Sequence, residues 1–353
     1  MLGYLARRLL LAIPVLAGIL FVTFSLARVL PGDPCRIALG ERATDEICDA
    51  YIQRHGLDRP IPVQFGKYVA DVAGGDLGKS LKFQRPVTTI LAERFPTTIE
   101  LSLAALGFAI LVGVPLGLIS GYRHNSRVDV ASMVGANAGV SMPVFWLGLM
   151  LQYLFAVLLR DTFLRLPPSG ILDAGQSARP FFEVYGWAEN GLFDFISHAT
   201  ILNATLGGSW EVAWSGIRHL ILPAIALGTI PLALIARVTR SSLLDVLGLD
   251  YVRTARAKGL GERLVVLRHA ARNALLPVVT VIGISLGSLL GGAILTETTF
   301  NLTGIGKTLF EGITGQDYTI VQGVTLVVAV GFVVINLVVD LLYAYLDPRV
   351  RLR

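Results

Sequence analysis

The sequence predicts an all-α membrane protein with six membrane-spanning helices. Of its 353 residues, 54% are hydrophobic and only 16% are charged, whereas a soluble globular protein carries about a quarter charged residues. The hydrophobic residues also gather in uncharged runs, and most of these runs reach the roughly 20 residues needed to cross a bilayer. The six runs are Leu9–Ala27, Leu101–Tyr122, Val130–Leu159, Leu220–Ala236, Asn273–Thr296 and Tyr318–Val339.

The first run has two interpretations. Arg7 and Arg8 precede it, as basic residues precede the core of a secretory signal peptide. However, the run is longer than the roughly 7–15 residues of such a core, and no Ala-x-Ala cleavage site follows before Pro31-Gly-Asp-Pro34. We therefore expect an uncleaved anchor over residues 1–30.

Basic residues predict the orientation of the chain. If the N-terminus is inside, the inner segments are 1–8, 122–128, 237–272 and 346–353, with 15 Lys and Arg in 59 positions. The outer segments 31–98, 161–218 and 298–317 hold 13 in 146 positions. Because basic loops stay on the cytoplasmic side, both termini are expected there. The basic pI of about 9.3 thus reflects topology, and nucleic-acid binding is not expected.

Residues 31–98 are predicted to form a small cap on the outer face, since acidic and basic residues balance there and proline and glycine interrupt it. Thr44, followed by two acidic residues, predicts the start of a helix. Cys35 and Cys48, the only cysteines, both lie in this region. On an oxidising face they would be able to form a disulfide; alternatively, both are small hydrophobic residues of a short helix.

A second outer segment, residues 160–218, holds three of the four tryptophans: Trp187, Trp210 and Trp214. Tryptophan is enriched at membrane–water interfaces, so we expect helices that lie along the interface. A seventh crossing is disfavoured, because this segment carries acidic residues and a further crossing would invert every downstream loop.

Gly283, Gly287 and Gly291 form a stripe of small residues in the fifth run. Small residues four positions apart let two helix backbones approach closely in a membrane. The stripe therefore predicts a helix–helix contact, either within the chain or with another subunit.

Two short patterns imitate enzyme sites. Gly283-Ile-Ser-Leu-Gly287 matches the nucleophile elbow of hydrolases, but a serine inside a span lacks the strand–turn–helix and the neighbouring base that an elbow requires. Gly304-Ile-Gly-Lys-Thr308 imitates the end of a phosphate-binding loop, but Asn301 stands where that loop needs its first glycine. We therefore expect no catalysis, no ATP binding and no metal site in this chain.

The span interiors hold no charge except Asp340, near the inner end of the sixth run. A carboxylate inside the membrane costs roughly 2.5–3.5 kcal/mol. We expect it to pair with an inner basic residue such as Arg237 or Arg240.

The inner segment 237–272 contains the most informative pattern, Asp250-Tyr-Val-Arg-Thr-Ala-Arg-Ala-Lys-Gly259. Ala255 and Ala257 would let the surface of another protein approach the backbone, and Gly259 can take the left-handed turn that ends a helix. A solvated loop obeying the positive-inside rule explains the bases but not this spacing of small residues.

With Arg268-His-Ala-Ala-Arg-Asn-Ala-Leu-Leu-Pro277 behind it, the Ala255-x-x-x-Gly259 spacing resembles the cytoplasmic coupling motif of ATP-binding-cassette (ABC) importer permeases. The amino-acid sequence of this segment is similar to that of the dipeptide/oligopeptide/nickel branch of these importers. Arg253 and Thr254 replace the Glu and Ala of the general motif, a departure that is usual in the first of the two permeases of the peptide branch. The resemblance covers most of the chain, including Pro143-x-Phe-Trp-Leu-Gly148 and Glu297-Thr-Thr-Phe-Asn301-x-x-Gly304-x-Gly306.

The resemblance implies the type I ABC importer permease fold. Residues 1–30 would be the anchor, 31–98 the cap, 99–345 a core domain of five spans, and 346–353 a basic inner tail. Within the core, 160–218 would be an outer insertion and 237–272 the coupling loop. The implied ATPase-coupling residues are Tyr251, Val252, Arg253, Thr254, Ala255, Arg256, Ala257, Lys258, Gly259 and Leu260.

The resemblance also implies the partners of the chain in a bacterial or archaeal plasma membrane. These are a second, homologous permease, two cytoplasmic ABC ATPases that bind Mg-ATP, and an outer substrate-binding protein. The implied activity is peptide import, with nickel, glutathione and oligosaccharides as alternative substrates. A secondary transporter is the alternative from another class. However, apart from Asp340 near the inner end of the sixth run, the sequence shows neither the intramembrane carboxylates nor the paired broken helices expected of such a carrier.

Overall fold

The computed structural model describes residues 2–29, 35–36, 43–56 and 58–346. Within these ranges the regular elements are helices, and the only β-pairing is an isolated bridge between Lys79 and Pro86. The fold is therefore all-α, as predicted. The N-terminal part contains α1 (Leu2–Val29), α3 (Asp45–His55) and α4 (Ile61–Ala73).

The remaining elements form a bundle and its connections. The bundle helices are α5 (Val87–Tyr122), α6 (Arg127–Ser141), α7 (Val144–Gln152) with the π-helix η1 (Tyr153–Leu158), α11 (Trp210–Leu247), α14 (Ala271–Gly292) and α17 (Tyr318–Leu346). The connections on the α3–α4 side contain α8 (Phe181–Val184), α9 (Gly191–Ser197), α10 (Thr200–Leu206), α15 (Ile294–Thr299) and α16 (Ile305–Thr314). The opposite end holds α12 (Asp250–Ala257), α13 (Glu262–Leu264) and the π-helix η2 (Val265–Ala270).

Five helical segments of the described chain are long and apolar enough to cross a membrane: Ala6–Leu26, Val87–Tyr122, Trp210–Leu247, Glu262–Gly291 and Tyr318–Leu341. A sixth crossing exists if α6 and the segment 144–158 are counted as one broken span, because they meet at a bend of 100°. The six-span prediction is met in this sense. The third run is not one continuous helix, because Pro143 holds the preceding Met142 in an extended conformation (φ −94°, ψ 134°) that stops α6.

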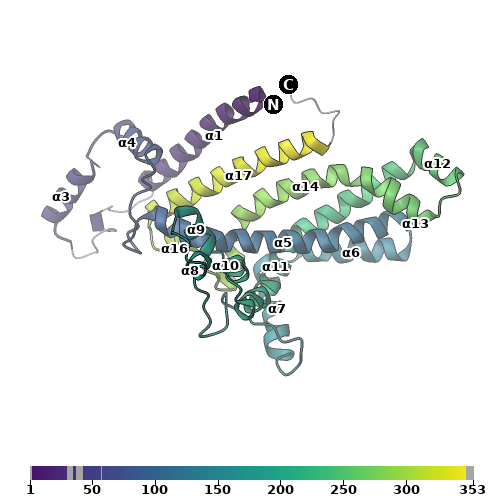
Figure 1. Ribbon diagram of the computed structural model, residues 1–353. Helices are drawn as coiled ribbons and strands as arrows, with labels where there is room; N and C mark the ends of the chain where they lie inside the picture. The colour runs from purple at the N-terminus through teal and green to yellow at the C-terminus, as the bar shows by residue number, and fades with distance from the viewer. Residues whose placement is uncertain (1, 30–34, 37–42, 57, 347–353) are drawn as a thin grey trace.

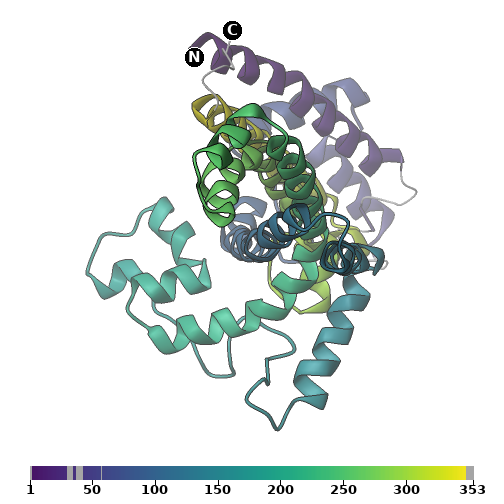
Figure 2. The same cartoon turned by 90° about the vertical axis from the view of Figure 1, so that its right-hand side faces the viewer.

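The long helices run side by side and give the molecule two distinct ends (Figure 1). α1 and α17 lie along one side, with α14, α11 and α5 next and α6 on the far side. α12 projects at one end, and α3 and α4 lie at the other. Viewed along the bundle, α7–η1 and the helices of the outer insertion extend sideways from it (Figure 2). The main core lies where α5, α11 and α14 pack together.

A glycine stripe that the sequence analysis did not single out brings α5 and α11 into backbone contact. A Cβ on Gly113, Gly117 or Gly121 would lie 2.9, 2.5 or 3.1 Å from the carbonyl oxygen of residue 232, 236 or 240, on successive turns of α11. Gly228 of α11 makes the reciprocal approach, 2.6 Å from the carbonyl of Ala105. The two longest helices therefore pack without room for side chains between them.

The stripe that was predicted, on α14, packs within the chain. A Cβ on Gly283 would collide with Val339, one on Gly287 would lie 2.9 Å from Phe332, and one on Gly291 would lie 3.5 Å from Val328. All three contacts are to side chains of α17. The α14 stripe thus accommodates branched and aromatic side chains of its neighbour and leaves the backbones further apart than in the α5–α11 pair.

Several predicted boundaries differ from the helix ends. α5 begins at Val87, so the boundary expected at residues 98–99 falls inside this helix. α11 extends from Trp210 to Leu247 and overlaps both the outer insertion and the predicted coupling loop. The reason is physical: uncharged runs report the hydrocarbon depth, whereas these helices continue into the polar regions on both sides. The predicted tail lies outside the described residues apart from Leu346, as does Pro31–Pro34.

The cap is attached to α1 by aromatic contacts. The ring of Phe65 on α4 packs edge-on against Phe21 and Phe24 of α1, at centroid distances of 5.5 and 5.3 Å. α3 begins directly after Thr44, although the hydroxyl of Thr44 makes no capping hydrogen bond. Cys35 and Cys48 are joined by a disulfide and are almost completely buried.

Asp340 pairs with an inner basic residue, as predicted, but with neither of the two named examples. Its carboxylate lies 2.8 Å from the guanidinium of Arg8 on α1, in the predicted inner segment 1–8. Arg240 instead binds Asp129 of α6 through two hydrogen bonds of 2.7 Å. Arg237 donates to the side chain of Asn137, at 2.8 Å. Arg237 and Arg240 both face α6, so neither points towards α17.

Candidate coupling site and outer clasp

The segment singled out in the sequence forms a short helix, α12, at the end of the bundle opposite the cap (Figure 1). Val252 is completely buried and Ala255 is 6% exposed. Both pack in a small core with Leu243 and Val246 of α11 and with residues of η2 and α14. The spacing of three residues places 252 and 255 on one helix face, and this apolar face fixes α12 to its own bundle.

The exposed face of α12 carries polar side chains and one alanine. Arg253, Thr254, Ala257 and Lys258 are all exposed, and Ala257 has the smallest side chain of the four. The expectation that Ala255 receives the surface of another protein is therefore wrong, because Ala255 faces inward. Only Ala257 has the outward position that such a role needs.

The helix ends as its sequence predicts. Gly259 has a φ of +78°, which is a left-handed conformation. A residue with a side chain adopts this conformation only at a cost in free energy. Its N–H donates to the carbonyl of Arg256 at 2.9 Å. Arg256 forms a two-point salt bridge with Glu262, at 2.7 and 3.1 Å, which ties the end of α12 to α13.

A second connection leads from α12 to the spans. Asn273, in the first turn of α14, donates to the hydroxyl of Tyr251 at 2.7 Å. The same hydroxyl lies 3.4 Å from the carbonyl of His269 in η2. A displacement of α12 would therefore act on the start of α14, both through this hydroxyl and through the shared core.

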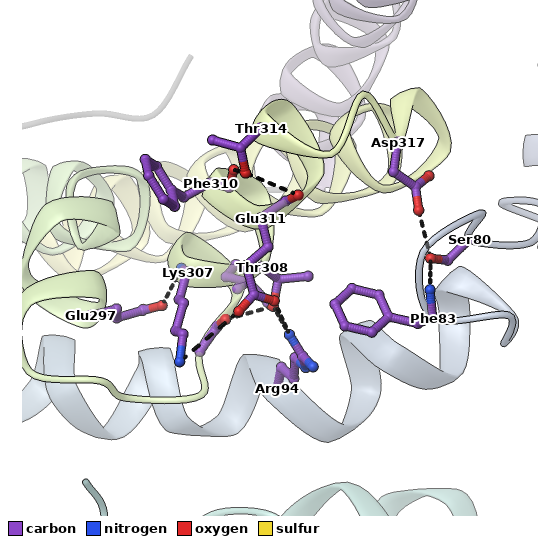
Figure 3. Close-up of polar contacts among 12 residues, drawn as sticks. Ser80, Phe83, Arg94, Glu297, Lys307, Thr308, Phe310, Glu311, Thr314 and Asp317 are labelled. Carbon is purple, nitrogen blue, oxygen red and sulfur yellow. Dashed lines mark hydrogen bonds and ion pairs between the residues drawn. The ribbon is translucent and has the colours of Figure 1, made fainter. Parts of the chain in front are cut away.

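At the opposite end, polar contacts join the outer part of α5 and the segment before it to the loop between α14 and α17. We call them the outer clasp, which comprises Ser80, Arg94, Thr98, Glu297, Thr308, Glu311 and Asp317; Figure 3 labels all of these except Thr98. Ser80 donates to Asp317 at 2.6 Å, and the N–H of Lys82 donates to the same oxygen at 3.0 Å. Arg94 donates to Thr308 at 2.9 Å and lies over the ring of Phe83.

Glu297 is the innermost group of the outer clasp and is completely buried. It accepts hydrogen bonds from the hydroxyl of Thr98 at 2.7 Å and from the N–H of Lys307 at 2.8 Å. Burial raises the pKa of Glu297 to about 7, and these hydrogen bonds only partly oppose the effect. A Cβ on Gly304 would collide with its carboxylate, and one on Gly306 would lie 2.8 Å from the backbone of Ile294. The glycines that imitate a phosphate-binding loop thus make room for Glu297.

Comparison with known proteins identifies the family. Residues 113–352 match the family model of the binding-protein-dependent transport system inner membrane component, and residues 1–103 match the N-terminal model of such membrane components. The chain belongs to this family. This confirms the resemblance to ABC importer permeases and places the chain among multi-pass inner-membrane proteins.

Relatives align with this permease over nearly its whole length. The dipeptide transport system permease protein of Alkalihalophilus pseudofirmus is 47% identical over 99% of the chain and 100% of the relative. The di/tripeptide transport system permease protein of Pseudomonas aeruginosa is 46% identical over 99% of each chain. The glutathione transport system permease protein of Pectobacterium atrosepticum is 37% identical, also over 99% of each.

Sequence reasoning missed three features of this permease. The α5 stripe Gly113-x-x-x-Gly117-x-x-x-Gly121 is as regular as the stripe on α14 and was readable from the sequence. The Tyr251–Asn273 bond joins residues 22 positions apart, which no local pattern indicates. The Thr98–Glu297 bond spans 199 positions and likewise follows only from the fold.

Among the described residues, no group of His, Cys, Asp and Glu is arranged to hold a metal ion.

Proposed function

We propose that this permease forms half of an import pathway for short peptides and that α12 docks on a cytoplasmic ATPase. The observation that carries the proposal is the division of α12 into a face fixed to the bundle and an outward face of Arg253, Thr254, Ala257 and Lys258. A helix held in this way can bind a partner and still pass a displacement to its own spans. The names of the aligned relatives support a peptide substrate.

The proposed orientation places α12 and both termini in the cytoplasm. The beginning of α1 and the end of α17 point towards the α12 end of the bundle, and the cap lies at the other end (Figure 1). The disulfide in the cap supports an outer, oxidising location for that end. Basic residues concentrate on the α12 side, in agreement with the positive-inside rule.

In the proposed mechanism the chain itself binds no nucleotide. Two partner ATPases bind Mg-ATP and close together, and the closing motion displaces α12. Through Tyr251 and the core shared with η2, the displacement reaches α14 and shifts the assembly from an inward-facing to an outward-facing state. Nucleotide drives this shift because it binds more tightly to one of the two states. A second permease completes the cavity, and an outer binding protein delivers the peptide.

The test is co-purification of the tagged chain from its native membranes, combined with uptake of a labelled dipeptide by the reconstituted complex. Replacing Ala257 by Trp places a bulky ring on the outward face of α12 without disturbing the buried face. We expect at least a tenfold loss of bound ATPase and of ATP-driven uptake, with normal amounts of the chain in the membrane. Ala50→Trp, the same change at an exposed position of α3, is the matched control.

Three results would contradict the proposal. If Ala257→Trp retained its ATPase and its uptake, α12 would not be the docking helix. If the complex did not import dipeptides but imported nickel or an oligosaccharide in an ATP-dependent way, the protein would still be an ABC importer permease and only the proposed substrate would be wrong. Transport by the purified chain alone, driven by a proton or sodium gradient, would favour a secondary transporter.

A further inference from the structure

A cavity of about 720 Å³ lies on the outer side of the bundle, between the loop after η1 and the outer part of α11. This volume is within the roughly 300–1,000 Å³ of typical ligand sites. Its lining includes Arg160, Arg165 and Arg218, together with Phe163 and Trp214. We call it the arginine cavity.

The charge of the arginine cavity is unusual for its surroundings. Residues 161–218 contain six acidic residues and three arginines, yet two of those arginines line this cavity and are joined there by Arg160. Asp161 is the one acidic residue in the lining, and it pairs with Arg160 at 3.1 Å. Among the described residues, neither Arg165 nor Arg218 forms a salt bridge with a carboxylate, so two guanidinium charges are left uncompensated.

The arrangement is held by the backbone. The guanidinium of Arg218 donates to the carbonyl of Arg165 at 3.0 Å, which fastens the loop to α11. This bond uses one of the five N–H donors of Arg218, and the guanidinium of Arg165 keeps its own donors. Two or more N–H groups on each of two arginines are a suitable set for the oxygens of a phosphate group.

The position of the arginine cavity matches the boundary of the hydrocarbon region. Arg160 directly follows the uncharged run that ends at Leu159, and Arg218 stands two positions before the run that begins at Leu220. Two different spans thus change from apolar to basic at the same cavity. Phe163 and Trp214 are 94% and 61% exposed beside the arginines, as expected for aromatic side chains at the membrane interface.

We propose that the arginine cavity binds the phosphate of an anionic phospholipid, whose acyl chains lie against the apolar surface of η1. Leu158 and Val157 of η1 are 59% and 51% exposed, which provides that surface next to the cationic group. Charge complementarity favours an anionic headgroup over a zwitterionic one, because the cationic partner of a zwitterion would meet the same uncompensated arginines. The inference does not depend on which substrate the permease transports.

Quenching of Trp214 fluorescence tests this proposal in nanodiscs that contain the full chain with its co-purifying subunits. The probes are brominated phosphatidylglycerol and brominated phosphatidylcholine at equal mole fraction, and a Trp214→Phe variant isolates the signal of Trp214. We expect a preference of at least about fivefold for phosphatidylglycerol, the size expected for one arginine at an anionic surface. The preference should disappear in R165Q/R218Q and persist in R165K/R218K, which keeps both charges.

Arg179→Gln is the matched control, since Arg179 is the remaining arginine of the outer insertion and is exposed outside the arginine cavity. It should retain the full preference. Equal quenching by the two lipids, or an undiminished preference in R165Q/R218Q, would overturn the proposal. So would an absence of quenching by either lipid, because another subunit would then cover the site. If millimolar inorganic phosphate or a dipeptide abolished the preference, a soluble anion would be the occupant and the lipid proposal would fail.

Discussion

At the scale of single residues, the two alanines of α12 have different environments and predict different phenotypes. Ala255 packs in the core that α12 shares with α11, η2 and α14, whereas Ala257 faces outward. Replacing Ala255 by Trp overfills this core, and such overpacking costs about 1–3 kcal/mol or more. We expect a lower melting temperature in detergent for Ala255→Trp and an unchanged one for Ala257→Trp. Equal melting temperatures would show that residue 255 is not buried.

Tyr251 gives a prediction about coupling that is separate from docking. Tyr251→Phe removes the hydroxyl that accepts from Asn273 and leaves the aromatic ring. A net loss of about 0.5–1.5 kcal/mol for one hydrogen bond should raise the ATP hydrolysed per peptide imported by a few fold, with ATPase binding intact. Tyr185→Phe is the matched control, because it removes a tyrosine hydroxyl that donates to the carbonyl of Leu206 in the outer insertion, away from α12. An unchanged ratio in Tyr251→Phe would remove this bond from the coupling path.

Glu297 predicts a pH dependence of stability. Its pKa is raised by burial to about 7, above the ordinary value near 4.5, so the folded protein holds this proton more tightly than the unfolded chain. The contribution is complete below pH 4.5 and is lost as the pH rises through 7, with roughly 3 kcal/mol at stake. We expect the melting temperature of the permease to fall between pH 5 and pH 8. The fall should be smaller in Glu297→Gln, and equal slopes in the two proteins would contradict the assignment.

At the scale of elements, the two glycine stripes predict opposite tolerance to a methyl group. At Gly117 a Cβ would lie 2.5 Å from the carbonyl of Ala236, a backbone atom that cannot move aside. At Gly291 the nearest atom is a methyl of Val328 at 3.5 Å, an ordinary contact. We expect Gly117→Ala to cost about 1–3 kcal/mol and Gly291→Ala to lie within about 0.5 kcal/mol of the parent. Thermal melting of the two variants compares them directly, and a tolerated Gly117→Ala would mean that α5 and α11 are further apart.

The elements also show how far the sequence could predict this fold. Runs of apolar residues gave the position of each long helix in the described chain. A helix that crosses a membrane needs about 20 apolar residues in a row, and such a run can be read directly from the sequence. They did not give the helix ends, since α5 and α11 continue beyond the hydrocarbon region with polar residues that a hydropathy criterion discards. The run Val130–Leu159 did not reveal the 100° bend between α6 and α7, because the direction of a bend depends on packing.

The candidate site was predictable in part for the same reason. The position and length of α12 and its glycine end follow from local chemistry, since Gly259 takes the left-handed turn that its position suggested. Which face of α12 is buried depends on α11 and α14, so the role given to Ala255 was wrong. The outer clasp joins residues about 200 positions apart, and the partner of Asp340 comes from the first span; neither follows from spacing along the chain.

At the scale of the whole molecule, the two ends of the bundle are held together in different ways. The outer clasp fixes the outer part of α5 to the loop between α14 and α17 (Figure 3), whereas α12 is attached at the opposite end by one small core and a few polar bonds. A force applied at α12 would therefore meet a stiff outer end. We expect changes of shape at the bend between α6 and α7 and at the proline-containing helices, because regular helix hydrogen bonding is interrupted there.

The salt bridge between Arg8 and Asp340 has a consequence for how the protein is made. Arg8 belongs to α1 and Asp340 to α17, so more than three hundred residues are synthesised between them before the two can meet. Until α17 has been made, α1 lies in the bilayer without the helix along which it packs in the finished protein. A chain truncated before α17 lacks both the carboxylate of Asp340 and the helix that packs along α1, so its bundle stays open on that side. Such a truncated chain exposes the face of α1 that α17 covers in the finished subunit.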